Sequence, residues 1–370
     1  MKITDVTLTL FGWESVPSTV YGHHSARPTG KSDLGLLRVV TDEGIEGHAF
    51  LGTSSNPASL DGPALIRFLK PVVLGQDPLD RERLNRLLWN RVRTATVRSI
   101  GAVDIALWDI AGKKAGLPIH RLIGTCRDKI GAYASSEIHA SREAYAEQAQ
   151  HYKSTGWHAY KIHPPQRWQE DIKVCEAVRK AVGDDYRVML DSTWSYRYEE
   201  ALRVGLAIQE MGFYWYEDPL HDQDIYNYVK LRQKLDIPIL ATEYPIAGLD
   251  SYIPWITERA TDMLRGDVAV KGGIMSGLRF RRQTTARVCT RRCRQRKRTT
   301  RCDHDAGEFP ATTPQRPVRP TRSRTTHGPA RLSLRPWRSW PAASASGCRR
   351  AGCPSRSGPS RFGRRCSPSG

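Results

Sequence analysis

Apolar and polar residues alternate near the N-terminus in the way that half-buried strands require. Val6, Leu8 and Leu10 occupy every second position, and a second alternating run reaches a turn at Asp42 before apolar residues resume. This pattern predicts one strand followed by a β-hairpin. Residues 17–33 separate the two and are rich in Gly, Ser, His and Pro. They predict a long loop of the kind that is often functional in compact domains.

Helical spacing replaces this alternation after the hairpin. Apolar residues recur three and four positions apart at 65–69, 84–92 and 99–110, which predicts three amphipathic helices. The second helix is expected to begin at the Asp-Pro pair of Asp77, because Pro is favoured in the first turn of a helix. Residues 1–125 are therefore expected to form an α+β domain.

Strand and helix patterns then alternate along residues 126–280. Short apolar runs recur about every 25 residues, which is the spacing of βα units in a parallel sheet. The predicted strands are 130–135, 159–163, 187–191, 213–217, 239–243 and 263–270. Six such units suit a (β/α)₈ barrel that lacks its last two units. The expected fold class is α/β, with an α+β domain followed by an incomplete barrel of the TIM type.

Residues 281–370 show neither period and differ in composition from the rest. The chain has a formal net charge of +19, yet 23 Arg and one Lys against three acidic residues lie from Arg279 onward, leaving 33 basic and 35 acidic residues before it. This tail also holds six of the eight Cys and ten of the 23 Pro, and no Ile, Tyr, Asn or Met. We expect it to be disordered, because it cannot bury enough apolar surface to offset its chain entropy.

Three explanations of the tail remain open. It is a natural basic arm, which would bind nucleic acid through phosphate contacts; a zinc module; or translation in a shifted reading frame. The zinc candidates are Cys289, Cys293, Cys302 and His304, whose spacing matches no common structural zinc site. The loss of Ile, Tyr, Asn and Met with a gain of Arg, Pro, Ser and Cys favours a shifted frame of a GC-rich gene, so no nucleic-acid partner is expected.

The chain shows no sign of membrane insertion or export. No run of 18 or more apolar residues occurs, so no membrane partner is expected. The N-terminus alternates like a strand and lacks the charged start and apolar block of a secretory signal. We expect a cytoplasmic protein.

Three acidic residues end successive predicted strands of the barrel. Asp191, Glu217 and Glu243 are each 26 residues apart, and the C-terminal ends of barrel strands open on one face. Carboxylates that converge there suit Mg²⁺. Alternatively, each acid is an unrelated cap of the following helix. Their common register, and the apolar run before Glu217, favour a metal site.

Further candidates flank these acids. Lys161 and His163 are two residues apart, so on a strand they share a face, and either would act as a base beside a cation. For Lys161 a lowered pKa is expected there; the alternative for both is a solvated strand end. Asp267 ends the predicted sixth strand and would orient a His from the next one. We interpret Lys271 as a lysine at a helix start.

Taken in order, these motifs resemble the enolase superfamily, and within it the mandelate racemase and muconate lactonizing enzyme branch. The resemblance covers residues 1 to about 280. The matching segments are SIGAVDIALWDIAGKKAGLPIHRLIG, YKIHPP, MLDSTW, WYEDPL, ATEYP and GDVAVKGGI. It implies that residues 1–125 cap a modified barrel, and that Asp191, Glu217 and Glu243 bind Mg²⁺, with Mn²⁺ as a substitute. It also implies a homo-oligomer and a cap loop whose Tyr21, His23 and His24 cover the substrate.

The chain departs from the family pattern in two places. His163 stands where the family usually has a second Lys, so either Lys161 or His163 is the base. The His of the seventh strand, which in the family pairs with the residue matched by Asp267, and the acid or other electrophile of the eighth strand have no counterpart here.

The resemblance implies an enzyme that removes the proton next to a carboxylate of a small hydroxy acid or acid sugar through an enolate intermediate, and then racemises or dehydrates it. The polar cap loop favours an acid-sugar dehydratase. We expect impaired activity in this chain. The alternatives are a non-functional frameshifted product and a nucleic-acid-binding protein with a basic tail.

Overall fold

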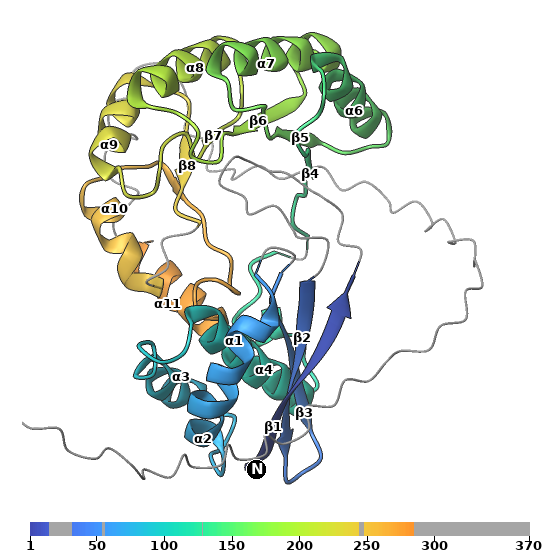
Figure 1. The fold of residues 1–370 in the computed structure, drawn as a ribbon, viewed down its shortest axis with the longest axis vertical. Coiled ribbons are helices and arrows are strands. Elements are labelled where there is room, and N and C mark those ends of the chain that lie inside the picture. Colours follow the sequence, from blue (N-terminus) through green and yellow to red (C-terminus); the bar gives the residue numbers. More distant parts are fainter. Residues whose placement is uncertain (15–31, 54–55, 128, 244–247, 285–370) are drawn as a thin grey trace, which may run out of the picture. The chain divides into compact units, whose positions relative to one another are not determined.

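The computed structural model describes residues 1–14, 32–53, 56–127, 129–243 and 248–284 (Figure 1). All of them belong to one compact unit. The predictions for the tail beyond Thr284, disorder and zinc binding included, lie outside these residues. No helix within the described part is long and apolar enough to cross a bilayer.

The N-terminal sheet confirms the predicted strand and hairpin. Its antiparallel strands, in the order β1-β2-β3, are β1 (Ile3–Trp13), β2 (Ser32–Thr41) and β3 (Glu46–Leu51). Leu37 in the central strand pairs with Leu8 on one side and Ala49 on the other. All three side chains are buried, so the alternation in sequence places one apolar face of this sheet against the helices that follow.

Helices follow the sheet. They are α1 (Ala58–Ala64), the π-helix η1 (Leu65–Leu69), α2 (Lys70–Val73), α3 (Arg81–Trp89), α4 (Val97–Ala115) and α5 (Ile119–Leu122). Of these, α1, η1, α2 and α4 contact the sheet, while α3 and α5 pack against α4. Thr96 caps α4 by accepting a hydrogen bond from Ser99 N, and Gly116 ends it in the left-handed conformation. The predicted start of α3 at Asp77 was wrong, because the Asp77 carboxylate accepts from Leu79 N and closes a turn instead.

The barrel domain carries six parallel strands among the described residues. They are β4 (Ala134–Ser135), β5 (Ala159–Ile162), β6 (Arg187–Asp191), β7 (Tyr216–Glu217), β8 (Ile239–Ala241) and β9 (Met263–Leu264), in the order β4-β5-β6-β7-β8-β9. The helices between them are α6 (Arg142–Ser154), α7 (Trp168–Val182), α8 (Tyr198–Glu210), α9 (Ile225–Lys234), and η2 (Gly248–Tyr252) with α10 (Ile253–Thr257). Figure 1 shows α6 to α10 along one side of the sheet, which confirms an incomplete α/β barrel.

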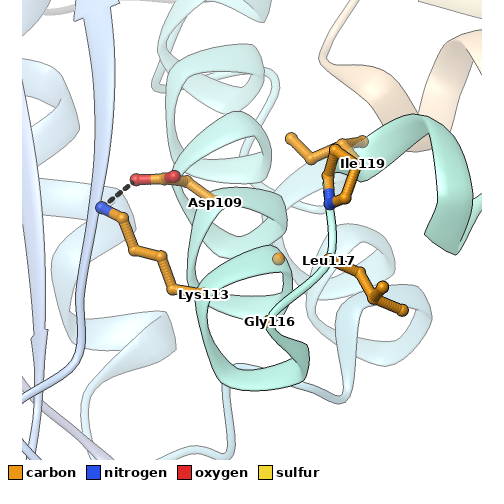
Figure 2. A pocket seen from close by; sticks show the side chains of 7 residues that line it. Asp109, Lys113, Gly116, Leu117 and Ile119 are labelled. Carbon is orange, nitrogen blue, oxygen red and sulfur yellow. Dashed lines mark hydrogen bonds and ion pairs between the residues drawn. The ribbon is translucent and has the colours of Figure 1, made fainter.

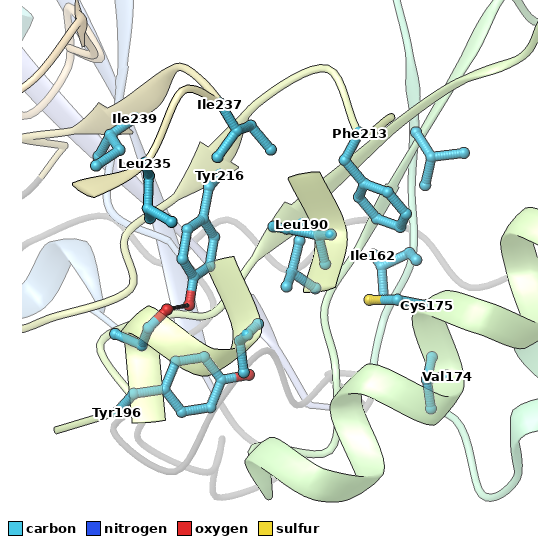
Figure 3. Packing of buried hydrophobic residues seen from close by; sticks show 14 of the residues in the cluster. Ile162, Val174, Cys175, Leu190, Tyr196, Phe213, Tyr216, Leu235, Ile237 and Ile239 are labelled. Atoms are coloured by element: carbon cyan, nitrogen blue, oxygen red, sulfur yellow. Dashed lines mark hydrogen bonds between the residues drawn. The ribbon is translucent and has the colours of Figure 1, made fainter. Parts of the chain in front are cut away.

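One row of residues forms the apolar side of this sheet. Ile162, Leu190, Tyr216 and Ile239 are successive partners across four strands, and all are fully buried. Figure 3 shows them in the cluster that includes Cys175 of α7. Because side chains alternate along a strand, the residues that follow Leu190 and Tyr216 face the opposite side of the sheet.

The last predicted strand is much shorter than expected. Residues 263–270 were predicted as one strand, but β9 ends at Leu264 and the chain then turns. The Asp267 carboxylate accepts from Ala269 N, and Gly272 and Gly273 have positive φ. Helix α11 (Ile274–Thr284) begins only after this turn.

A surface hollow of about 310 Å³ lies at the end of α4 (Figure 2). It forms where the chain reverses after Gly116, and Leu117 N donates back to Gly112 O. Its two charged side chains, Asp109 and Lys113, pair with each other at 2.7 Å. The hollow is thus a product of the helix end and contains none of the predicted site residues.

Candidate active site

Two of the predicted acids meet at adjacent strand ends. Asp191 ends β6, Glu217 ends β7, and the two are direct partners in the parallel ladder. Both lie on the sheet face opposite to the apolar row of Leu190 and Tyr216. Glu217 is fully buried and Asp191 is 2% exposed. The structure therefore brings these carboxylates together, as their strand-end positions predicted.

Lys161 of β5 reaches the same point. Its Nζ lies 2.7 Å from Asp191 Oδ2 and 3.4 Å from each carboxylate oxygen of Glu217. Burial alone would lower the pKa of Lys161, but the charges of Asp191 and Glu217 outweigh burial and raise it. The lowered pKa expected for this lysine applies to a lysine beside a bound divalent cation and stays a prediction. Burial likewise opposes the charge of Asp191, yet Lys161 and then His163 hold the pKa of Asp191 below its usual range.

His163 is clamped between a carbonyl and a carboxylate. Its Nδ1 lies 2.6 Å from Ser136 O, and its Nε2 lies 3.1 Å from Asp191 Oδ2. The backbone is held as well, because His163 N donates to Ser136 Oγ and Tyr145 OH donates to His163 O. The ring is thus oriented from two sides and points one nitrogen at the carboxylate pair.

Arg265, which was not a predicted site residue, joins this cluster from the position directly after β9. Its Nη1 contacts Glu217 Oε1 and lies 3.8 Å from Asp191 Oδ2, while its Nη2 lies 2.8 Å from Glu243 Oε1. Burial disfavours its charge, but Glu217 and then Glu243 raise the pKa of Arg265. No sequence signal marked it, because Arg265 lies just beyond the end of β9.

Glu243 lies apart from the other two predicted ligands. It comes after Thr242, whose φ of 86° interrupts the strand, and its side chain is 18% exposed. In the described part of the chain, the acidic group whose ligand atoms lie within 4.8 Å of one another consists of Asp191, Glu217 and Asp218. Glu243 is linked to this group through Arg265.

Asp218 was missed by the sequence argument. It is 4% exposed, and burial, followed by the charge of Asp191, raises its pKa strongly. Its Oδ1 has no hydrogen-bond partner among the described residues. A buried carboxylate oxygen without a donor is costly unless a cation or a proton satisfies it. Together with Asp191 and Glu217 it offers the hard oxygen ligands that divalent cations prefer, so the residues present fit a metal ion.

Backbone strain is concentrated at these strand ends. Thr193 and Trp194 after β6, Asp218 after β7 and Thr242 after β8 all have positive φ without being glycine. Such conformations cost free energy and persist where the surroundings enforce them, commonly at functional sites. The strain thus marks the same edge of the sheet as the carboxylates do.

The remaining predicted residues lie elsewhere. Asp267 is exposed in the turn after β9, so the prediction that it ends a strand was wrong. Lys271 does not start a helix either: it is buried at 4% exposure, its Nζ lies 4.7 Å from the centre of the Tyr252 ring, and burial lowers its pKa to about 8. The cap-loop residues Tyr21, His23 and His24 lie outside the described residues.

Comparison with known proteins agrees with this geometry. The family model described as the N-terminal domain of mandelate racemase / muconate lactonizing enzyme matches residues 8–124, and that described as enolase C-terminal domain-like matches residues 144–289. The chain belongs to the mandelate racemase/muconate lactonizing enzyme family. The resemblance inferred from the motifs is thereby confirmed.

Several members of this family are similar to the chain over most of its described length. The crystal structure of D-glucarate dehydratase from Agrobacterium tumefaciens, complexed with magnesium, is 33% identical with a TM-score of 0.69, covering 77% of this chain and 78% of that one. Arabinonate dehydratase of Saccharolobus solfataricus is 30% identical over 56% of this chain, and L-talarate/galactarate dehydratase of Salmonella typhimurium is 28% identical over 69%. The chain spans 58% and 65% of the lengths of these two relatives.

Proposed function

We propose that the chain is a divalent-metal-dependent enzyme of this family that removes the proton next to a carboxylate. The observation that carries the proposal is the 2.7 Å contact between Lys161 Nζ and Asp191, beside the paired Glu217. A base and the group that anchors a substrate must lie this close for proton removal to be efficient. Asp191, Glu217 and Glu243 are proposed to hold Mg²⁺ or Mn²⁺, which supplies a Lewis acid for the substrate carboxylate.

Lys161 is proposed as the base and His163 as a positioning residue. The two ring nitrogens of His163 face Ser136 O at 2.6 Å and Asp191 Oδ2 at 3.1 Å. Both ring nitrogens are thus engaged by oxygen atoms of the protein rather than open to a substrate. The role of His163 is then to hold Asp191 in place, which leaves proton removal to the Lys161 amine.

The proposed substrate is an acid sugar, and the proposed reaction is dehydration. The α-proton passes to the Lys161 amine, the ammonium so formed returns a proton to the β-hydroxyl, which leaves as water, and the enol product rearranges to a 2-keto acid. Relatives named as dehydratases of arabinonate, talarate/galactarate and glucarate support this choice. Racemisation is disfavoured, because it needs a second acid/base group on the opposite face, and among the described residues Asp267 lies in an exposed turn.

Calorimetric titration with Mg²⁺ tests the metal site. Glu217→Gln is expected to weaken binding about tenfold or more, the scale for losing a ligand charge. Glu82→Gln is the matched control, since Glu82 pairs with Arg279 on the surface far along the chain from the strand ends. Equal weakening by both substitutions, or by neither, would remove the site assignment.

Activity of the chain as it stands is proposed to be impaired. Among the described residues the sheet ends at β4 and β9, each with a neighbour on one side, whereas a closed barrel has no edges. The chain should be assayed with Mg²⁺ and a panel of acid sugars, beside a version whose reading frame is shifted from codon 279. The shifted version is expected to turn over about 10²–10⁴ times faster, the usual contribution of one acid/base group. Equal turnover would contradict both the frameshift and the impairment.

A further inference from the structure

Negative charge at the strand ends is balanced by the protein's own cations. Four carboxylates belong to this region: Asp191, Glu217, Asp218 and Glu243. In the described part of the chain their ion pairs are made by Lys161 and Arg265, and His163 Nε2 lies 3.1 Å from Asp191 Oδ2. Lys161 and His163 approach from β5 and its end, while Arg265 approaches from the far side, directly after β9.

Arg265 is placed to bridge two of the proposed metal ligands. Its two terminal nitrogens point at different carboxylates, Nη1 at Glu217 and Nη2 at Glu243, the latter at 2.8 Å. The planar guanidinium suits this because its donors form a rigid fork. The backbone fixes the fork, since Arg265 N donates to Ala241 O and Arg265 O accepts from Thr242 Oγ1. The guanidinium cation therefore already lies between Glu217 and Glu243. A metal ion held by the same two carboxylates would bring a second positive charge to this place.

We propose that Arg265 is an internal counter-ion of the metal site, which neutralises the carboxylates when no metal is bound and competes with the divalent cation for them. The inference rests on the metal site proposed above and deepens it. Like charges repel strongly at short range in a buried environment, so guanidinium and metal cannot both contact Glu217 without a cost. Arg265 thus makes metal binding weaker.

The same contact protects the metal-free protein. Buried carboxylates that lose their only nearby cation are strongly destabilising, and Glu217 is fully buried. Lys161 remains within 3.4 Å of Glu217, whereas among the described residues Glu243 forms its ion pair with Arg265. Arg265 is therefore expected to raise the stability of the metal-free fold while it lowers the affinity for metal.

Mn²⁺ titration of the full-length chain, followed by electron paramagnetic resonance of the free ion, tests this without measuring activity. Arg265→Gln is expected to bind Mn²⁺ about tenfold more tightly or better, the range seen when a group beside metal ligands is changed. Without metal it is expected to melt at a lower temperature than the original chain. Saturating Mn²⁺ should raise its melting temperature by more than it raises that of the original chain. Arg265→Lys keeps the charge but reaches one carboxylate, so its affinity should lie between the two.

Arg232→Gln is the matched control. Arg232 has a similar exposure, 26% against 28%, and pairs with Asp262 at 3.0 Å, away from the strand-end carboxylates. Its loss is expected to leave Mn²⁺ affinity unchanged. If Arg265→Gln folds only with Mn²⁺ present, this dependence on metal supports the proposal. The Mn²⁺ affinity of Arg265→Lys is then compared with that of the original chain.

The outcomes separate this inference from the proposed function. Unchanged or weaker Mn²⁺ binding by Arg265→Gln, in a chain that itself binds Mn²⁺, overturns the counter-ion role and leaves the metal site standing. Binding by Arg265→Gln but not by the original chain supports the counter-ion role and contradicts metal-dependent activity of the original chain. If no variant binds Mn²⁺, both proposals fail.

Discussion

Two buried aspartates, one in the N-terminal domain and one in the barrel, have opposite surroundings. Asp104 in α4 is fully buried and accepts from two neutral donors, Asn85 Nδ2 and Met275 N, both at 3.0 Å. Asp191 is equally buried but faces the Lys161 ammonium and the His163 ring. Burial raises the pKa of Asp104 to about 6, whereas Lys161 and the hydrogen bond from His163 outweigh burial and hold the pKa of Asp191 below its usual range.

The difference shows how one chain uses buried charge for two purposes. Asp104 ties α4 to the start of α11 through Met275 N, and so joins elements that are 171 residues apart. Asp191 instead contacts Lys161 and His163 at the strand ends of the barrel. Hydrogen bonds from neutral donors suffice to hold elements together. A carboxylate that takes part in chemistry must instead stay ionised, which needs a cation beside it. Substitutions in the two regions should therefore separate stability from activity.

The largest effect is expected at the barrel strand ends. Lys161→Met removes the proposed base and should slow exchange of the substrate α-proton with solvent deuterium about 10²–10⁴-fold. Lys173→Met, on the exposed side of α7, is the control and should exchange at the original rate. An unchanged rate in Lys161→Met would transfer the base role to His163.

A truncation in the N-terminal core should instead lower stability. Leu107→Ala empties a fully buried position and should reduce the free energy of unfolding by about 2–5 kcal/mol in denaturant titrations. Leu60 is 70% exposed, so Leu60→Ala should cost under about 0.5 kcal/mol. Metal affinity of the folded Leu107→Ala protein should not change; if it does, the two regions are coupled and the comparison fails.

Asp104 should make stability depend on pH in a defined window. Its folded-state pKa of about 6 lies above the ordinary value of 3.8, so the folded state holds the proton more tightly than the unfolded state does. Its contribution to stability is therefore largest below about pH 4 and is lost as the pH rises through 6. A shift of this size corresponds to about 2–3 kcal/mol.

Asp104→Asn should flatten the pH profile of unfolding between about pH 4 and 6, and Asp236→Asn, at an exposed position, should not. Unfolding by urea at several pH values measures both. Identical profiles for the original chain and Asp104→Asn would show that burial does not raise the pKa of Asp104.

The smallest effect concerns the turn that meets Asp104. Gly273 has a φ of 98°, and an added Cβ would lie 2.3 Å from Asp104 Oδ2. Gly156 has a φ of 90° with nothing within 4 Å of such a Cβ. Each Gly→Ala change should cost about 1–3 kcal/mol for backbone strain, and Gly273→Ala should cost more because of the contact. Equal melting temperatures of the two variants would show that the chain moves freely around Asp104.

The sequence alone predicted the order of elements and the meeting of Asp191 and Glu217. Periodicity was sufficient because side chains alternate strictly along strands, and because parallel strands end at a common edge. The same rule placed Lys161 and His163 on one face. Local turn chemistry was harder to predict, because Asp77 and Asp267 close turns with their own side chains. The helix after Asp77 was therefore predicted to begin too early, and the strand before Asp267 was predicted to end too late.

Only the tertiary structure decided which charges contact each other. Nothing in the chain order indicates that Arg265 lies between Glu217 and Glu243, since Glu217 ends β7 while Glu243 and Arg265 follow the ends of β8 and β9, and their distances depend on how these strands are aligned. The positive φ of Thr242 and Asp218 likewise turns Glu243 away and Asp218 inward. Sequence period determines the face on which a side chain lies, but the balance of buried charge depends on distances of a few ångströms between strands, which packing alone sets.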